Sequence, residues 1–464
     1  MLKQYPIMNL KRILTLPLLL ALSLGAGAQQ AEVVRLFAEN PDRASNNMHS
    51  YEFDPIVDTP APKGFKPFYI THYGRHGSRY EQNSTFGRNA QAGFAYLDSL
   101  GLLTPAGKAL WADVEAVVDA HKGMEGSLTP RGAREHQQIA ARMAHRYPGI
   151  FKDKNRQEVN CFSSTNFRCI VSMCNFTYGL KDVFPKIQFT FTSAERFMSY
   201  INPSLSVPRP GEAPRPRGSF PGGFGRPQEQ PQGFKPFEGE PGYDFHRFLT
   251  PLFTDYDAAV KALGNPEPFV KAIFTTGGLC QLIDFLGIDI YRKYFTPEEL
   301  AYFWADGNDN IYRMWGGSAE QGDVIRYAIR PLLMDFVQKA DAALEPGSQR
   351  AADLRFGHDT SILPLFALLG VDDPQGRVFP YKEAHLHNWY AFFQVPMATN
   401  IQMVFYKNNK GEVLTKILYN EKEITIPGIE PVSGPYYSWP ELRAHFYRLC
   451  EKAAEPWTRA GIVN

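Results

Sequence analysis

The pattern of apolar positions predicts strands near both ends of the chain. Residues 68–70 form a short apolar run that leads into a polar, glycine-bearing loop, and residues 188–192 alternate between apolar and polar positions, as is typical of a strand. Residues 354–360 show the pattern of another strand followed by a loop. Two further apolar runs, 401–406 and 413–419, flank an Asn-Asn-Lys-Gly turn signal and predict a pair of strands.

The predicted helices are marked by capping residues. Thr104 and Thr129 each precede a proline, so each supplies an N-cap followed by proline at the first helical position. The Ser-Ser-Thr run at 163–165 supplies capping residues for a helix that extends to about Tyr178, with Gly179 as its stop. Helical patterns also dominate the middle of the chain. The sequence therefore predicts an α/β core with a helical insertion.

The predicted domain division follows these element types. Residues 29–195 and 341–464 are expected to form the α/β core, and residues 196–340 a mainly α-helical insertion. A chain of 464 residues is long enough for this arrangement. The insertion includes a stretch at about 203–241 that is dense in proline and glycine, for which we expect a long loop.

The first 28 residues have the order of a secretory signal. Lys3, Lys11 and Arg12 precede an apolar run at 13–24, and small residues follow as far as Ala28. We expect cleavage after Ala28 and a periplasmic or secreted protein without a stable membrane anchor, a retained anchor being the alternative. Some of the five cysteines can pair in an oxidising compartment, and an odd number leaves at least one without an intramolecular partner.

Overall charge is nearly balanced, with 49 lysines and arginines against 48 aspartates and glutamates. The field of the whole protein therefore gives no argument for a nucleic-acid partner. A preference for an anionic ligand must come from local arginines. The cysteine and histidine spacing shows no zinc pattern, and we interpret His385 and His387 as ordinary loop or strand histidines.

The candidate chemistry begins after the first predicted strand, where His76 stands between two arginines. Arg75 and Arg79 disfavour a protonated imidazole, and their guanidinium groups match the oxygens of a phosphate. Gly77 leaves room for a backbone to approach a ligand. The pattern favours a neutral His76 that attacks a phosphoryl group held by the arginines. The alternative is a solvated basic loop.

Two distant segments fit the same chemistry. Arg168 is predicted in the first turn of a helix, where free backbone N–H groups also favour an anion. His358 can donate a hydrogen bond to phosphate, and Asp359 can protonate a leaving oxygen. The alternatives are a surface arginine in the first case, and a capping aspartate beside a core histidine in the second.

These segments resemble the histidine acid phosphatase branch of the histidine phosphatase superfamily. The resemblance rests on Arg-His-Gly-x-Arg at 75–79, the Thr-Pro-x-Gly helix start at 129–132, the Ser-Thr run before Arg168, and a distant His-Asp pair. Residues 400–406 and 418–422 are similar to the multiple inositol polyphosphate phosphatase group in particular. The resemblance covers the chain from about residue 65 to the C-terminal region.

The resemblance implies a phosphoglycerate-mutase-like α/β fold and a phosphatase that works through a phosphohistidine. His76 would be the nucleophile and Asp359 the proton donor. It implies a small phosphorylated substrate and no metal or organic cofactor. The phosphoryl oxygens would be held by Arg75, Arg79, Arg168 and His358.

Two departures from the family pattern bear on the substrate. The inositol polyphosphate group commonly has His-Ala-Glu where this chain has His358-Asp359-Thr360, and Tyr80 replaces a frequent proline. We expect phytate or other inositol phosphates as substrate. The alternatives are a broad-specificity acid phosphatase or sugar-phosphate phosphatase and, in another class, an inactive phospholigand-binding protein. We also expect the reaction rate to be highest on the acid side of neutral pH. The nucleophilic His76 must be neutral, and Asp359 must begin protonated.

Overall fold

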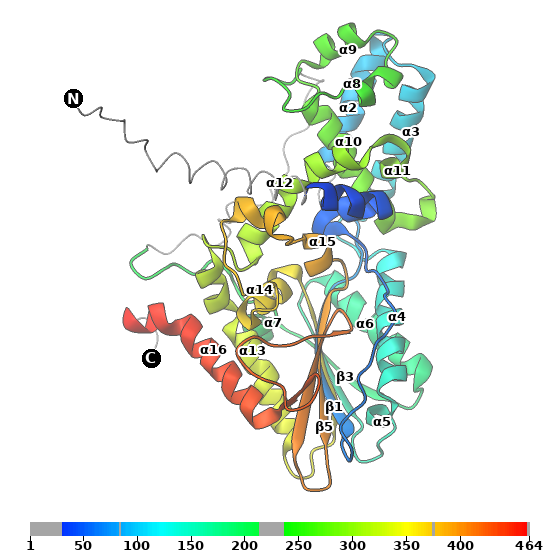
Figure 1. Cartoon of the computed structure of the whole chain (residues 1–464). Helices are drawn as coiled ribbons and strands as arrows, with labels where there is room; N and C mark the ends of the chain where they lie inside the picture. Colours follow the sequence, from blue (N-terminus) through cyan, green and yellow to red (C-terminus); the bar gives the residue numbers. More distant parts are fainter. Residues whose placement is uncertain (1–29, 83–84, 213–235, 374–375, 462–464) are drawn as a thin grey trace, which may run out of the picture.

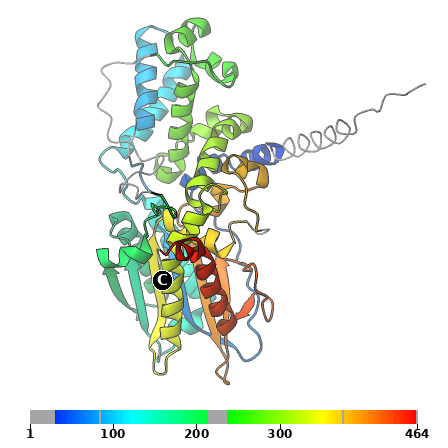
Figure 2. The same cartoon turned by 90° about the vertical axis from the view of Figure 1, so that its left-hand side faces the viewer.

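The computed structural model describes residues 30–82, 85–212, 236–373 and 376–461. The predicted signal peptide, and residues 213–235 of the predicted proline- and glycine-rich loop, lie outside these described residues. Figures 1 and 2 show two parts, one built on a twisted sheet with helices on both faces and the other entirely helical. The α/β fold with many helices, predicted from the sequence, is confirmed.

The sheet has eight strands in the order β3-β2-β4-β1-β5-β6-β7, with β8 paired to β6. Its first four strands are parallel, whereas the remaining strands pair antiparallel with their neighbours. The strands predicted above are all present, as β1, β3, β4, β5 and β6. The bounds of the eight strands are β1 (Lys66–Arg75), β2 (Glu158–Ser163), β3 (Gln188–Ser193), β4 (Arg350–Gly357), β5 (Asn400–Lys407), β6 (Val413–Tyr419), β7 (Lys422–Glu423) and β8 (Tyr436–Ser438).

Both faces of the sheet are covered, which explains why β1 is almost continuously buried. Tyr69 packs into the core on one face and Ile70 into the core on the other, as strand alternation requires. Six helices form most of these two layers. They are α4 (Pro130–Arg146), α5 (Pro148–Phe151) and α6 (Phe167–Val183) on the Ile70 face, and α13 (Gly322–Leu344), α14 (Asp359–Leu369) and α16 (Trp439–Arg459) on the Tyr69 face.

The helical part has a hydrophobic core of its own. Phe94 of α2 packs edge-on against Phe269 of α10, with 4.9 Å between ring centroids. Burial in this core explains why α10 is apolar, since most of its residues lie inside the core. The helices of this part are α2 (Thr85–Ser99), α3 (Pro105–His121), α8 (His246–Leu249), α9 (Tyr256–Leu263), α10 (Glu267–Leu279), α11 (Ile290–Tyr294) and α12 (Pro297–Trp315).

The observed grouping of helices differs from the prediction, which placed residues 196–340 in the helical insertion and the rest of the chain in the α/β core. Helices α2 and α3 were expected in the core, but their apolar faces pack on α10. Helix α13 was expected in the insertion, but it covers the sheet.

Short helices connect the larger elements. They are η1 (Pro41–Met48), η2 (Glu195–Phe197), α7 (Met198–Ile201), η3 (Thr250–Leu252), η4 (Cys280–Leu286), η5 (Tyr381–His387) and α15 (Ala391–Gln394).

The caps test the sequence predictions directly. Thr104 and Thr129 accept hydrogen bonds from the third helical N–H, as predicted. The α6 cap differs, because Ser163 ends β2 and Asn166 is the N-cap. Gly179 does not stop α6, which continues to Val183. A Cβ at Gly179 would lie 2.4 Å from the carbonyl oxygen of Gln137, so this glycine instead allows α6 to approach α4.

Candidate active site

The predicted site residues converge at the carboxyl ends of three neighbouring parallel strands. β1 ends at Arg75, β2 at Ser163 and β4 at Gly357, and the loops that follow lie side by side because the strands do. The backbone N–H of His76 donates to the carbonyl of Gly357 at 2.9 Å, which joins two of these loops. They border a cavity of about 640 Å³ whose lining includes His76, Arg79, Arg168, His358 and Asp359.

His76 is held as a neutral imidazole with one nitrogen free. Its Nδ1 lies 2.9 Å from the carbonyl oxygen of Gly77, which can only accept, so the proton is on Nδ1 and Nε2 keeps its lone pair. Burial, followed by the charges of Arg168 and Arg75, holds the pKa of His76 well below its ordinary value. The predicted neutral nucleophile is thus available in the geometry.

The structure explains the glycine at position 77 differently from the prediction that it leaves room for a ligand. A Cβ at this position would lie 2.6 Å from the carbonyl oxygen of Gly132, and a Cβ at Gly132 would lie 2.2 Å from the carbonyl oxygen of Ser78. The space beside Gly77 is therefore occupied by the start of α4 and not by a ligand. Glu135 of α4 fixes the same loop, because it accepts from the N–H and the hydroxyl of Ser78, each at 2.7 Å.

The arginines around His76 have guanidinium donors with no protein acceptor. The Nε atoms of Arg75, Arg79 and Arg168 are buried without a hydrogen-bond partner among the described residues. Burial and the charges of Arg168 and Arg75 lower the pKa of Arg79 to about 10. A bound anion would reduce the repulsion between the guanidinium groups and would accept hydrogen bonds from the free N–H donors. A phosphate has the oxygens for both.

His358 bridges two neighbouring elements. Its Nδ1 lies 3.4 Å from Nη2 of Arg168, which can only donate, and its Nε2 lies 2.9 Å from the hydroxyl of Ser164. Burial and the charge of Arg168 lower its pKa to about 4. In this structure the His358 proton is therefore directed at Ser164 and not into the cavity.

Asp359 is held ionised in the structure. Its Oδ2 accepts from Nη2 of Arg75 at 2.7 Å and from Nδ2 of Asn47 at 2.9 Å. Burial by itself raises the pKa of this carboxyl, but the charges of Arg75 and His358 outweigh it and hold the pKa below its ordinary value. A proton donor must start protonated, so ligand binding has to change this environment.

Asn47 and Glu135 were missed by the sequence reasoning. Asn47 lies on η1, 312 positions before Asp359, and its own carbonyl accepts from Nη1 of Arg75 at 2.5 Å. No local pattern marks either residue. His72 packs against the rings of Phe176 and Phe356, and neither of its ring nitrogens has a hydrogen-bond partner among the described residues.

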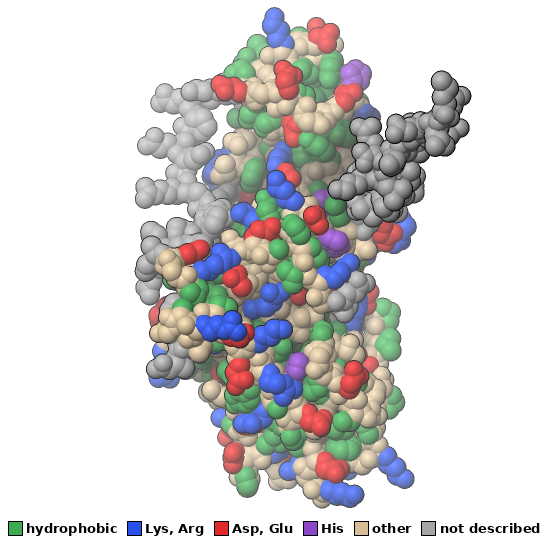
Figure 3. All heavy atoms as spheres, turned by 60° about the vertical axis from the view of Figure 1, so that its left-hand side comes forward, with side chains coloured by type: hydrophobic (Ala, Val, Ile, Leu, Met, Phe, Trp, Pro, Cys, Tyr) green, Lys and Arg blue, Asp and Glu red, His purple; other side chains and the backbone are tan. Residues whose placement is uncertain are grey.

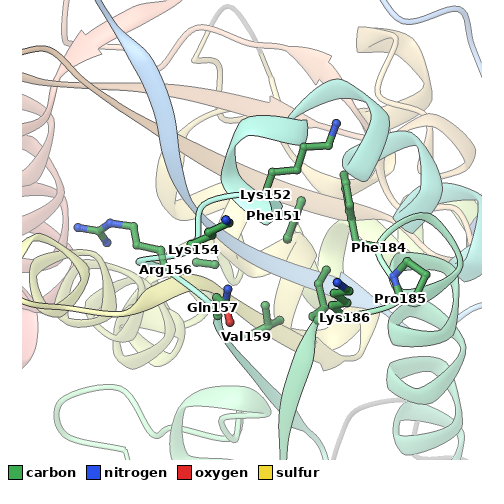
Figure 4. Close-up of a pocket in the computed structure, with 11 residues that line it drawn as sticks. Phe151, Lys152, Lys154, Arg156, Gln157, Val159, Phe184, Pro185 and Lys186 are labelled. Atoms are coloured by element: carbon green, nitrogen blue, oxygen red, sulfur yellow. The ribbon is translucent and has the colours of Figure 1, made fainter.

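A second cavity of about 380 Å³ lies at the opposite end of the sheet (Figure 4). Phe151, Val159 and Phe184 form its apolar floor. The guanidinium of Arg156 extends away from the cavity and donates to the carbonyls of Ala343 and Arg350. None of the predicted site residues lines this cavity, so the candidate active site is the one around His76.

Comparisons with known proteins agree with the fold and the motif. Residues 74–192 match the family model described as histidine phosphatase superfamily, branch 2. Human multiple inositol polyphosphate phosphatase 1 is 22% identical over 342 residues, which are 65% of this chain and 62% of the human protein. This chain therefore matches less than two thirds of the length of that relative.

Two solved structures have the same fold. The apo form of Bifidobacterium longum multiple inositol polyphosphate phosphatase superposes with a TM-score of 0.66 at 18% identity, covering 87% of this chain and 97% of that one. The phytase from D. castellii superposes with a TM-score of 0.59 at 16% identity, covering 89% and 86%. The B. longum protein has also been solved in complex with inositol hexasulfate.

Proposed function

We propose that this chain is a histidine phosphatase, as the match of residues 74–192 to that family model supports, and that it hydrolyses phosphomonoesters through a phosphohistidine on His76. One observation carries the proposal. A buried, neutral histidine with a free Nε2 lines a cavity together with Arg79 and Arg168, whose Nε atoms, like that of the neighbouring Arg75, have no hydrogen-bond partner among the described residues. A cationic pocket of this kind binds a phosphoryl group and stabilises the charge that develops on it during transfer.

In the first half-reaction, Nε2 of His76 attacks phosphorus as the bond from phosphorus to the leaving oxygen breaks. Asp359 gives its proton to that oxygen, so the products are an alcohol and a phosphohistidine. Arg75, Arg79 and Arg168 hold the non-bridging oxygens throughout. In the second half-reaction the ionised Asp359 takes a proton from water, the resulting hydroxide attacks phosphorus, and inorganic phosphate leaves His76.

The protonation of Asp359 is coupled to substrate binding in this proposal. Arg75 lowers the pKa of Asp359 in the free enzyme. When a phosphate anion takes up the guanidinium of Arg75, that stabilisation weakens, and the negative phosphate raises the carboxyl pKa further. A substrate that arrives as a monoanion can also supply the proton. The reaction is therefore expected to be fastest on the acid side of neutral.

Two substrate classes follow from the sequence. Inositol phosphates, phytate among them, are favoured by the C-terminal segments and supported by the names of the relatives. The alternative is a broad range of phosphomonoesters, including sugar phosphates.

The predicted signal sequence supports action in the periplasm or outside the cell. An inactive phospholigand-binding protein is disfavoured because both His76 and Asp359 face the cavity.

Phosphate release by the purified full chain tests the reaction. Wild-type protein is compared with His76→Ala on p-nitrophenyl phosphate and on phytate. His246→Ala is the matched control, since this histidine packs on Tyr256 in the helical part. We expect His76→Ala to abolish turnover and His246→Ala to retain it. Full activity in His76→Ala would remove the central proposal.

A further inference from the structure

The second cavity, at the end of the sheet away from His76, has the features of a small-molecule binding site. Its volume of about 380 Å³ lies in the range of ligand pockets. We call it the distal pocket. It lies over the first residues of β2 and β4, between the loop 152–157 and the end of α6. Its apolar lining residues are Phe151, Val159, Phe184, Pro185, Ile187 and Ala351.

The apolar surface of the distal pocket is held in place by packing. Phe151 ends α5 and Phe184 follows α6, and their rings stack with 5.8 Å between centroids. Val159 and Ala351 are buried in the first turns of the parallel strands, where the side chain of Ala351 is too small to fill the space above it. An apolar ligand that covers this surface removes it from water, which favours binding.

The charges around this apolar surface have one sign. Every charged side chain among the described lining residues is basic, and these are Lys152, Lys154, Arg156 and Lys186. Lys154 and Lys186 form no ion pair or hydrogen bond with the rest of the described chain. Figure 4 shows these two lysines on either side of Val159. Their ammonium groups are therefore available to a ligand at the rim of the pocket.

The other charged groups nearby already have partners. Arg156 donates to two backbone carbonyls, and Nζ of Lys152 lies 5.8 Å from the centre of the Phe184 ring. Asp153 is next to two of the lysines in sequence, but it does not line the pocket. Its Oδ1 accepts from a backbone N–H of its own turn at 2.9 Å. The two remaining lysines thus keep their charge unpaired beside the apolar surface.

This arrangement differs from the surface seen elsewhere. On the molecular face shown in Figure 3, acidic and basic side chains are interspersed. At the distal pocket, basic side chains surround an apolar surface, with no carboxylate among the described lining residues. A neutral apolar ligand would leave the lysines without a partner, and an inorganic anion would leave the apolar surface exposed to water. A ligand that is apolar along its body and negative at one end satisfies both.

We propose that the distal pocket binds an amphipathic monoanion, a compound whose apolar ring or chain ends in a carboxylate or a sulfonate. The apolar part lies on the rings of Phe151 and Phe184, and the anionic group lies at the rim between Lys154 and Lys186. No described residue lines both this pocket and the catalytic cavity around His76. The proposal therefore goes beyond phosphoryl transfer and does not depend on it.

A matched pair of fluorescent probes tests the proposal. 8-Anilinonaphthalene-1-sulfonate is an aromatic monoanion, and N-phenyl-1-naphthylamine is its counterpart without the sulfonate. The full chain is titrated with each probe, with and without inorganic phosphate to occupy the arginines around His76. We expect the sulfonate to bind in both conditions. Binding that phosphate abolishes would place the sulfonate in the catalytic cavity and overturn the proposal.

Lysine variants locate the anionic group. Lys154→Met and Lys186→Met keep the length of the side chain and remove its charge. Each should raise the Kd of the sulfonate about two- to fivefold, the range of an exposed ion pair, and leave that of the amine unchanged. Lys261→Met, on α9 of the helical part, is the matched control and should change neither. An unchanged Kd of the sulfonate in the variant that carries both pocket substitutions would overturn the proposal.

Two further measurements complete the test. Phe184→Ala should weaken the binding of both probes, because it removes apolar surface that both cover. Decanoate should displace the sulfonate from the wild-type protein more effectively than decan-1-ol does, and the reverse order would contradict an anion site. Phosphate release should be the same in all these variants, since none of the substituted residues lines the catalytic cavity. Loss of phosphatase activity in His76→Ala with unchanged probe binding would show that the two sites are independent.

Discussion

Removal of the Asn47 side chain should move the pH dependence of the reaction toward higher pH. Asn47 donates one of the two hydrogen bonds that Oδ2 of Asp359 receives, and both favour the ionised carboxyl. A hydrogen bond to a charged group contributes about 1.5–3 kcal/mol. One pKa unit corresponds to about 1.36 kcal/mol, so the loss predicts a rise of about one to two units in the pKa of Asp359. We expect a pKa rise near the lower end of this range, because Arg75 still stabilises the ionised carboxyl of Asp359 in the variant.

The basic limb of the kcat/KM profile measures this effect, since that limb reports the free enzyme's proton donor. Asp359 must be protonated, so a higher pKa extends activity to higher pH by about one unit in Asn47→Ala. Asn47→Asp should shift the limb further, because a second carboxylate disfavours ionisation of the first. The substrate's own titration is common to all variants and does not contribute to the difference.

Asn160→Ala is the matched control for this experiment. Asn160 on β2 also donates to an aspartate, Asp353, at 3.3 Å, but neither residue lines the catalytic cavity. Its profile should coincide with that of the wild type. A basic limb that stays unchanged in both Asn47 variants would refute the assignment of Asp359 as the acid governed by Asn47.

Three other outcomes are expected. Asp359→Asn should reduce kcat by about a hundredfold or more for 2-phenylethyl phosphate but much less for p-nitrophenyl phosphate, whose leaving group needs no proton; equal losses would contradict the acid role. Gly132→Ala should lower the free energy of unfolding in urea by about 1–3 kcal/mol through its contact with the Ser78 carbonyl, whereas Gly149→Ala, with only ordinary contacts nearby, should not. Burial lowers the pKa of His136 to about 3, so the unfolded chain binds a proton that the folded chain excludes, and stability should fall as the pH drops below about 6.5. His136→Leu should flatten that dependence between about pH 3 and 6.5, and an unchanged slope would show that other groups cause it.

Features set by neighbours in sequence were predictable, and those set by distant contacts were not. The caps at Thr104 and Thr129 depend on residues within one helical turn, and the structure confirms them. The role of Gly179 depends on the backbone of α4, and its interpretation as a helix stop was wrong. The partners of α2 and α3 could not be inferred either, because an apolar helix face does not specify which surface it covers.

The candidate site shows the same distinction. The cluster of Arg75, His76 and Arg79 is visible in the sequence because three groups of one chemistry occupy a short loop. Its meeting with Arg168 and with His358-Asp359 was implied by the resemblance, and the strand order produces it. Asn47 carries no such signal, because its contact with Asp359 is made only when η1 folds against the helical part and the sheet.

Trapping of the phosphoenzyme tests the central claim most directly. The full chain is mixed with excess phosphomonoester, quenched in alkali during turnover, and digested, and the peptide that contains His76 is identified by mass spectrometry. The proposal predicts an alkali-stable, acid-labile phosphoryl group on His76 that forms and decays at rates compatible with turnover, and that is absent from His76→Ala. Rapid hydrolysis with no phosphoenzyme, or with the phosphoryl group on a different residue, would contradict it.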